Sequence, residues 1–300
     1  MKRILTAVIL SLVLMLVAAG CSSENTRNET IQADAPEASA LQNTTEAMNT
    51  PATEKESTRE FTLDHVLETD DLGDIHYNLC IPENYDRTHA YALHIALPGW
   101  EGLYFQGVGE DLRWEYMPHE SARYVQDMII ASLQLDSWDM KSARQVVALT
   151  EYLMKEYSVD SGRVYITGYS AGGETLSRVM EISSELYSAA LFMSSKWNGD
   201  PAPLTDAKTR LYIFTSEHDS YYGAEPARQA WQKIHDLYAA SGLSEDEILE
   251  MLVLDIRKDS WFDKAMKADM DRIESQFAMD YHGAGMLAAY DEGVMRWIFR

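Results

Sequence analysis

The sequence is poor in cysteine, and this limits the chemistry open to it. Its 2 cysteines are Cys21 and Cys80. Cys80 lies in a strand-like apolar run, where a thiol is expected to pack as a small core residue. Because Cys21 belongs to a separate N-terminal segment, we expect no disulfide inside the folded body.

Cationic residues are also scarce. Lysine and arginine number 25, against 48 aspartate and glutamate residues, which gives a net charge of −23. A chain this acidic is repelled by nucleic acid, so nucleic acid is excluded as a partner. The acidity alone does not indicate a cationic substrate, because a solvated acidic surface has the same composition. Cysteine and histidine lack the spacing of a metal site, and we expect neither a metal nor another cofactor.

The longest apolar run, residues 4–19, is shorter than the about 20 residues that a membrane-spanning helix needs. It follows a charged start and ends in the small residues 18–20. This pattern predicts a signal peptide over residues 1–20. Together with Cys21 it resembles a bacterial lipobox, which implies cleavage before Cys21 and a lipid on its sulfur. An uncleaved anchor and a soluble secreted form are the alternatives. In each case the body is exported, as a cell-surface or membrane-anchored protein in the lipobox interpretation.

Residues 21–59 are rich in Asn, Thr, Glu, Ala and Ser and almost devoid of large apolar side chains. Such a segment cannot bury enough surface to offset its ordering entropy, so it is expected to be a flexible tether. The remaining residues, 60–300, are enough for one large α/β domain.

Strand-like and helix-like patterns alternate through residues 60–300. We expect strands at 61–67, 75–81, 91–97, 128–133, 163–167, 189–193, 210–215 and 249–254, with amphipathic helices between the later ones and a last helix around 287–297. Two early strands followed by this alternation predict a mostly parallel sheet covered on both faces. Function in such sheets collects at the carboxyl ends of the strands.

The segment Gly168-Tyr169-Ser170-Ala171-Gly172 matches G-x-S-x-G between an expected strand and an expected helix. A sharp strand-to-helix turn exposes the serine hydroxyl, and small neighbours let the chain turn tightly. We therefore predict that Ser170 is a nucleophile, with a plain structural turn as the alternative. The Ala171 N–H at the helix start would hold a developing oxyanion.

A serine nucleophile needs a base and an orienting carboxylate. His282 lies among glycines in a loop before the last expected helix, and it is the predicted base, with His119 as the alternative. Asp219 follows the strand at 210–215 and is the predicted acid; Glu217 and then Asp255 are the alternatives. The order Ser170, Asp219, His282 is typical of α/β-hydrolases.

The second oxyanion donor is expected after the strand at 91–97, where the sequence reads Pro98-Gly99-Trp100. A glycine at this point lets the backbone bend so that the Trp100 N–H faces the site. Trp100 and Ala171 would then form the oxyanion hole.

The stretch DSGRVYITGYSAGG at 160–173 resembles the α/β-hydrolase superfamily, in particular its secreted esterase and prolyl-oligopeptidase-like branch, which includes feruloyl and acetylxylan esterases. The resemblance covers residues 91–300 and implies an eight-stranded, mostly parallel sheet with helices on both faces. The chain departs from this pattern in two places. Pro98-Gly99 replaces the His-Gly of many relatives, and residues 259–278 form a long insertion before His282, expected to contain a helix.

Aromatic residues recur in the loops expected at the strand ends, and planar apolar faces suit sugar rings or aromatic acyl groups. Four are predicted to bind substrate: Trp138, Trp197, Tyr221 and Trp261. The leading hypothesis is an esterase that forms an acyl-enzyme on carbohydrate-linked or small acyl esters. The alternatives are a peptidase of the prolyl-oligopeptidase type and a non-catalytic binding lipoprotein; the lack of a propeller-sized region argues against the peptidase.

Overall fold

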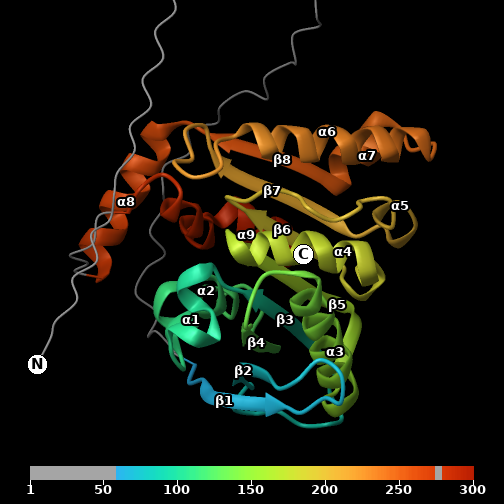
Figure 1. Ribbon diagram of the computed structural model, residues 1–300, viewed down its shortest axis with the longest axis vertical. Helices are drawn as coiled ribbons and strands as arrows, with labels where there is room; N and C mark the ends of the chain where they lie inside the picture. Colours follow the sequence, from blue (N-terminus) through green and yellow to red (C-terminus); the bar gives the residue numbers. More distant parts are fainter. Residues whose placement is uncertain (1–58, 274–278) are drawn as a thin grey trace, which may run out of the picture. The chain divides into compact units, whose positions relative to one another are not determined.

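The computed structural model describes residues 59–273 and 279–300. Within them, eight strands form one sheet in the order β1-β2-β4-β3-β5-β6-β7-β8, with β1 and β8 at its two edges (Figure 1). The strands are β1 (Thr62–Leu67), β2 (Ile75–Cys80), β3 (Tyr91–Leu97), β4 (Met128–Gln134), β5 (Val159–Tyr169), β6 (Ala189–Met193), β7 (Arg210–Ser216) and β8 (Leu252–Arg257). The pairs β1–β2 and β2–β4 are antiparallel and the others parallel, which confirms the predicted mostly parallel sheet.

The predicted signal peptide (1–20), the lipidation site Cys21 and all of the predicted tether except Arg59 lie outside the described residues. Within the part that is described, no helix combines the length and the hydropathy needed to cross a bilayer.

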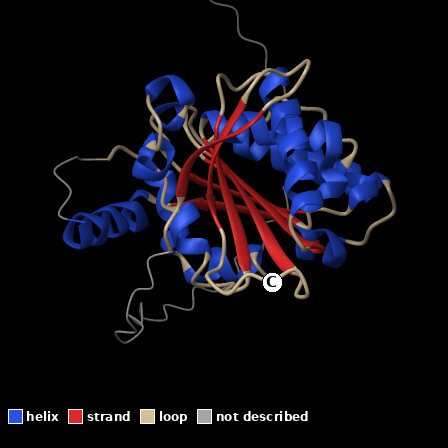
Figure 2. Cartoon of the chain, turned by 90° about the horizontal axis from the view of Figure 1, so that it is seen from below, coloured by secondary structure: helices blue, strands red, loops and turns tan. Residues whose placement is uncertain are grey.

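Helices cover both faces of the sheet (Figure 2). They are α1 (Glu110–Trp114), α2 (Met117–Ser121), α3 (Met140–Glu156), α4 (Ala171–Ser183), α5 (Leu204–Ala207), α6 (Glu225–Ala240), α7 (Glu245–Met251), α8 (Asp259–Ile273) and α9 (Glu292–Ile298), with 3₁₀ turns η1 (Trp100–Gly102), η2 (Tyr104–Gln106), η3 (Ser184–Leu186) and η4 (Gly283–Tyr290). One hydrophobic core packs α3, α4 and α6 against the sheet, and the other packs α2, η4 and α9. All seven residues of β3 are buried, as expected for a central strand covered on both faces.

The last strand begins later than predicted. The sequence pattern indicated a strand at 249–254, but the structure has α7 up to Met251 and β8 from Leu252 onward. The reason is a capping box: the Ser244 side chain accepts from the Glu247 N–H, and the Glu247 carboxylate accepts from the Ser244 N–H. These paired caps stabilise a helix start that the apolar pattern alone did not reveal.

The expected last helix around 287–297 is divided in two. Asp291 has an extended backbone between η4 and α9, and its carboxylate accepts from the Val294 N–H as the N-cap of α9. The cap ends one helical segment and begins the next, so the apolar periodicity continues through a break in the backbone. The helix expected within 259–278 is present as α8; residues 274–278 lie outside the described part.

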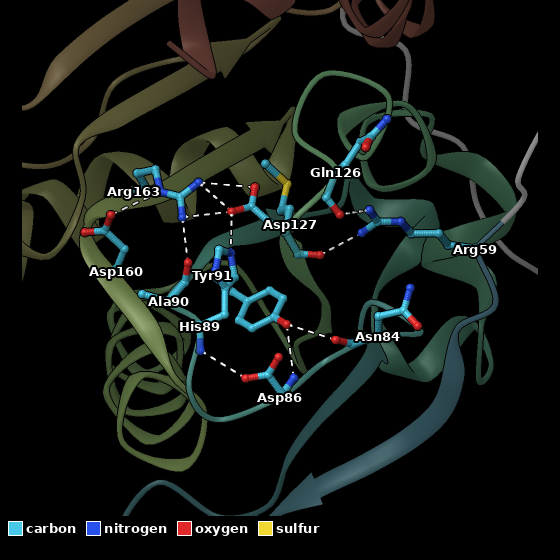
Figure 3. A network of polar contacts seen from close by, with 11 residues as sticks. Arg59, Asn84, Asp86, His89, Ala90, Tyr91, Gln126, Asp127, Asp160 and Arg163 are labelled. Atoms are coloured by element: carbon cyan, nitrogen blue, oxygen red, sulfur yellow. Dashed lines mark hydrogen bonds and ion pairs between the residues drawn. The ribbon is translucent and has the colours of Figure 1, made fainter.

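A polar network joins the amino ends of the parallel strands (Figure 3). The Arg163 guanidinium donates to the Asp127 carboxylate at 3.0 Å, to Asp160 at 3.1 Å and to the Ala90 carbonyl at 2.7 Å. His89 Nε2 lies 3.0 Å from the same Asp127 carboxylate. This network connects the amino ends of β3, β4 and β5, and Ser170 lies at the opposite, carboxyl end of the strands.

Candidate active site

Ser170 lies at the turn between β5 and α4 and has a strained backbone. Its φ of 52° and ψ of −115° are unfavourable for a residue with a side chain. A Cβ at Gly168 would lie 2.5 Å from the Gly172 carbonyl oxygen, and a Cβ at Gly172 would lie 2.2 Å from the Leu97 carbonyl oxygen. Only glycine fits at these two positions. The turn therefore has the shape that the G-x-S-x-G pattern predicts.

The structure brings Ser170, His282 and Asp219 together from three separate segments. His282 Nε2 lies 2.9 Å from Ser170 Oγ, and His282 Nδ1 lies 3.0 Å from Asp219 Oδ2. An ionised carboxylate can only accept, so Nδ1 carries the proton and Nε2 presents a lone pair to the hydroxyl. This is the geometry in which a histidine can take a proton from a serine.

The environment of Asp219 favours its charged form. Burial alone would raise its pKa, but hydrogen bonds from His282 and from the Tyr222 and Tyr221 N–H groups hold the pKa of this carboxyl below its usual value. The Tyr221 N–H donates to Oδ1 at 2.9 Å and the Tyr222 N–H at 2.8 Å. A carboxylate held this way stays ionised and oriented toward the imidazole.

A second contact fixes the two loops that carry the acid and the histidine. Ser220 Oγ donates to Asp280 Oδ2 at 2.6 Å and accepts from the His282 N–H at 3.3 Å. Asp280 also accepts from the Gly283 N–H at 2.8 Å. Sequence reasoning missed this link, although each of its two side chains lies within two residues of a predicted triad member.

The predicted oxyanion donors lie on two adjoining segments. Ala171 is the first residue of α4, where helical N–H groups have no acceptor inside the helix. The close approach of Gly172 to Leu97 places the end of β3 against this first turn. Trp100 follows in η1 and is 49% exposed. The donor role of the Trp100 N–H stays a prediction.

A buried glutamate, which sequence reasoning also missed, supports the segment before Trp100. Glu115 Oε1 accepts from the Gly99 N–H at 2.8 Å. Burial, with smaller contributions from Glu101 and Asp111, raises the pKa of Glu115 to about 8. Since Glu115 is distant in sequence from the strand end, no local pattern could have identified it.

His119, the alternative base, and two further histidines have other partners. His119 lies on the short helix α2, and its Nε2 is 2.9 Å from the Leu112 carbonyl oxygen on α1. His218 Nδ1 lies 2.8 Å from Asp259 Oδ2, so it neighbours the acid loop without contacting Ser170. His94 is buried between two hydroxyl groups, and burial lowers its pKa to about 3.

The alternative acids also lie apart from His282. Asp255 pairs with Arg257 at 2.8 Å and accepts from the Tyr212 hydroxyl. The Glu217 side chain is exposed, and its backbone N–H donates to the Arg257 carbonyl in the β7–β8 pairing. Asp219 is thus the carboxylate that contacts the imidazole.

The four predicted substrate-binding aromatics divide into two pairs. Tyr221 is 74% exposed and its ring centroid lies 5.3 Å from that of His282, so it borders the site directly. Trp138 is 37% exposed, and its carbonyl oxygen lies 3.4 Å from Arg178 Nη1. Tyr221 thus offers apolar surface beside the triad, whereas Trp138 offers it beside Arg178 on α4.

The other two aromatics pack against the cores. Trp197 contacts Phe192, with ring centroids 5.5 Å apart. Trp261 packs on Phe214 and under the Arg257 guanidinium, which lies 4.5 Å from its ring centroid. Each is only partly buried, and its part in substrate binding stays a prediction.

A polar group of five side chains lies beside the nucleophile; we name it the Glu174 cluster. The Glu174 carboxylate is buried and accepts from the Tyr222 hydroxyl at 2.6 Å and from the Asn198 side chain. Two cations stand near it: Lys196 Nζ at 3.8 Å and Arg178 Nη1 at 4.0 Å. Sequence reasoning missed the cluster. The signal was present, because Glu174 follows Ser170 by four residues, one helical turn.

Comparison with known proteins identifies the fold. The model of the prolyl oligopeptidase family matches residues 135–198, which include Ser170. A thermostable esterase of known structure is similar with a TM-score of 0.62 and 20% identity, over 80% of this chain and 62% of that chain. The chain has the α/β-hydrolase fold. Oligopeptidase B from Leishmania major is similar with a TM-score of 0.51 and 12% identity, over 81% of this chain and 36% of that chain. No curated protein matches the sequence.

The chain spans about three fifths of the length of the esterase and about a third of that of the oligopeptidase. The segment matched by the family model runs from the loop after β4 to the loop after β6. It contains the nucleophile turn and most of the Glu174 cluster, but not Asp219 or His282.

Proposed function

We propose that the protein is a serine hydrolase that acts as a carboxylic ester hydrolase through an acyl-enzyme. The observation that carries the proposal is the continuous hydrogen-bond chain from Ser170 through His282 to Asp219. The strained backbone at Ser170 supports it, since such strain is retained where the surrounding structure holds a functional group in place. The family match and the esterase of the same fold agree with a serine hydrolase.

The reaction follows from the geometry. Ser170 Oγ attacks the ester carbonyl carbon while its proton moves to His282 Nε2, and the carbonyl oxygen becomes an oxyanion near the Ala171 N–H. The intermediate collapses as the C–O bond to the alcohol breaks, and the His282 proton passes to the departing alcohol. Water then attacks the acyl-enzyme, giving up its proton to His282. The second collapse releases the carboxylic acid and returns the proton to Ser170.

The substrate class is proposed from the surface around the triad. The exposed Tyr221 ring beside His282 and the exposed Trp138 on the loop after β4 offer flat apolar faces, which favour carbohydrate-linked or small acyl esters. The match to the prolyl oligopeptidase family favours a peptidase as the second candidate. A panel of acetylated xylan, feruloylated sugars, short 4-nitrophenyl esters and prolyl peptides separates the two candidates.

Replacing the nucleophile tests the proposal most directly. The wild type is expected to be labelled by a fluorophosphonate probe and to hydrolyse a short aryl ester. Ser170→Ala should lose labelling and lower kcat by about 10⁴-fold or more, because it removes the attacking oxygen. Circular dichroism should show the fold unchanged. Unchanged hydrolysis by this variant, or a folded wild type that never labels, would refute the assignment; in the second case ligand binding without catalysis becomes the better account.

We further propose that the protein is exported and anchored to a membrane by a lipid on Cys21. The proposal is supported by the sequence of residues 1–21 alone. Cys21→Ser should move the protein from the membrane fraction to the soluble exported fraction and abolish incorporation of an alkyne-labelled fatty acid. Labelling that persists in this variant would contradict the assignment.

A further inference from the structure

Tyr222, in the loop after β7, contacts each residue of the triad with a different part of its structure. Its N–H donates to Asp219 Oδ1 at 2.8 Å. Its ring centroid lies 5.5 Å from that of His282, in an edge-to-face arrangement. Its hydroxyl is a hydrogen-bonding neighbour of the Ser170 hydroxyl. The proposed reaction uses only the first of these three contacts.

The proton of the Tyr222 hydroxyl is held by Glu174. The hydroxyl donates to Glu174 Oε1 at 2.6 Å, a short bond of the kind that a hydroxyl forms with a carboxylate. Burial, together with this carboxylate, raises the pKa of Tyr222, so the phenol keeps its proton. A phenol has only one proton to donate. Because Glu174 accepts it, the Tyr222 oxygen lies beside Ser170 Oγ without donating to it, and the lone pairs of the attacking oxygen stay free.

Glu174 is a fixed partner for this hydroxyl. It lies on α4, one helical turn after Ser170, and its N–H donates to the Ser170 carbonyl at 3.1 Å. Its side chain is 8% exposed, and its second carboxylate oxygen accepts from the Asn198 side chain. The Asn198 N–H in turn donates to Ser177 Oγ on α4 at 3.0 Å. The carboxylate is therefore held on the helix that begins at the nucleophile.

The bond between Tyr222 and Glu174 joins two segments whose relative position determines the rate. The loop after β7 carries Asp219, and α4 begins directly after Ser170. A hydrogen bond from Ser220 already joins the acid loop to the histidine loop. The tyrosine bond adds the connection to the nucleophile. Since a misplacement of about 1 Å can lower a rate about 100-fold, a bond that holds these segments together should affect catalysis directly.

We propose that Tyr222 is a positioning residue of the reaction. Through its bond to Glu174 it holds the acid loop against the helix of the nucleophile, and it directs its phenol proton away from Ser170 Oγ. Glu174 acts through Tyr222 and does not touch the substrate. The inference rests on the proposed serine hydrolase function and adds to it the residue that sets the geometry of the triad.

Two single variants and their combination test the proposal. Tyr222→Phe removes the hydroxyl and keeps the ring and the backbone N–H. With a short aryl ester, kcat should fall about tenfold, roughly the contribution of one hydrogen bond to a charged group, and KM should stay within about twofold of the wild type. Glu174→Ala should lower kcat further, because the phenol, without its acceptor, then donates to Ser170 Oγ. The double variant should match Tyr222→Phe, since no phenol proton remains.

Tyr212→Phe is the matched control. The Tyr212 hydroxyl also donates to a carboxylate, that of Asp255 at 2.7 Å, but its ring packs on Trp297. Its kcat should equal that of the wild type. Thermal unfolding should show that all variants fold, and if one single variant does not, the kcat of the other decides.

Three results would overturn the positioning role while leaving the hydrolase intact: a wild-type kcat in either single variant, a raised KM with unchanged kcat, or a double variant slower than both single variants. The last result would show two independent structural losses. Absence of both fluorophosphonate labelling and ester hydrolysis in the wild type would overturn the hydrolase function, and the positioning role with it.

Discussion

The two ends of the parallel strands carry polar networks that differ in kind. At the amino ends, Arg163 lies between Asp127 and Asp160, and opposite charges meet in a partly exposed, mutually satisfied group (Figure 3). At the carboxyl ends, Ser170 has a strained backbone, and His282 joins its hydroxyl to a buried carboxylate. In the first arrangement the charged groups are paired with one another and hold no nucleophile beside a base. The second holds a proton acceptor beside a hydroxyl group, at a cost in local strain.

The difference between the ends indicates how this fold separates stability from chemistry. The amino-end network is made of groups that water can also reach, so its contribution to stability is small and its geometry tolerant. The loops after β5 and β7 and the loop before η4 position the carboxyl-end groups. A shift of any one of these loops would break the chain of hydrogen bonds. Changes at the carboxyl end should therefore affect rate, and changes at the amino end should affect only stability.

The largest expected effect is at the carboxyl end. Asp219→Asn should lower kcat for a short aryl ester by about 10⁴-fold, because an amide can donate to Nδ1 and so favour the wrong imidazole tautomer. Thermal unfolding should show a folded protein. A variant that retains more than a tenth of the wild-type rate would break the comparison, because the buried carboxylate would then be structural only.

A stability effect of intermediate size is expected from Glu115, which supports the carboxyl end. Its folded-state pKa of about 8 lies above the ordinary value for glutamate, so the folded protein holds a proton that the unfolded chain loses. The contribution of this raised pKa to the free energy of unfolding is fully present below about pH 4. It is lost as the pH rises toward 8.

Glu115→Gln keeps an oxygen to accept from Gly99 and cannot ionise. The free energy of unfolding, measured with urea, should decrease from pH 5 to pH 8 less in Glu115→Gln than in the wild type. The two decreases should differ by on the order of a few kcal/mol. Glu151→Gln, at an exposed position on α3, should behave as the wild type. Parallel losses in Glu115→Gln and the wild type would contradict the raised pKa.

The smallest effect is expected at the amino end. Arg163→Met should lower stability by about 1 kcal/mol or less, because its partners Asp127 and Asp160 are 35% and 43% exposed and water screens the pairs. The melting temperature should fall by about 2–4 °C, while kcat for an aryl ester remains that of the wild type. Arg296→Met, which breaks an exposed pair on α9, is the control and should change neither. A large loss of activity in Arg163→Met would show that the two ends are coupled.

Local patterns predicted most of the fold because the strands in question are short apolar runs separated by helical periodicity. The bounds of β3 and β6 were predicted without error. The errors at β8 and at the last helix have one cause. Side-chain caps at Ser244 and Asp291 determine where helices begin, and apolar periodicity contains no information on caps. The nucleophile turn was predictable because its pattern is local: Gly168 is required by its contact with Gly172, although Gly172 itself is required by the approach of the distant Leu97.

The amino-acid sequence by itself determined the strand–turn–helix at Ser170, the order of the strands along the chain and the segments able to supply a histidine and an acid. Only the tertiary structure decided between Asp219 and Glu217, placed Glu115 under the loop after β3 and gathered Lys196 and Tyr222 around Glu174. The physical reason is that backbone preferences act over a few residues and leave a record in local sequence. Contacts between distant segments depend on how the sheet orders its strands, and no local pattern records them.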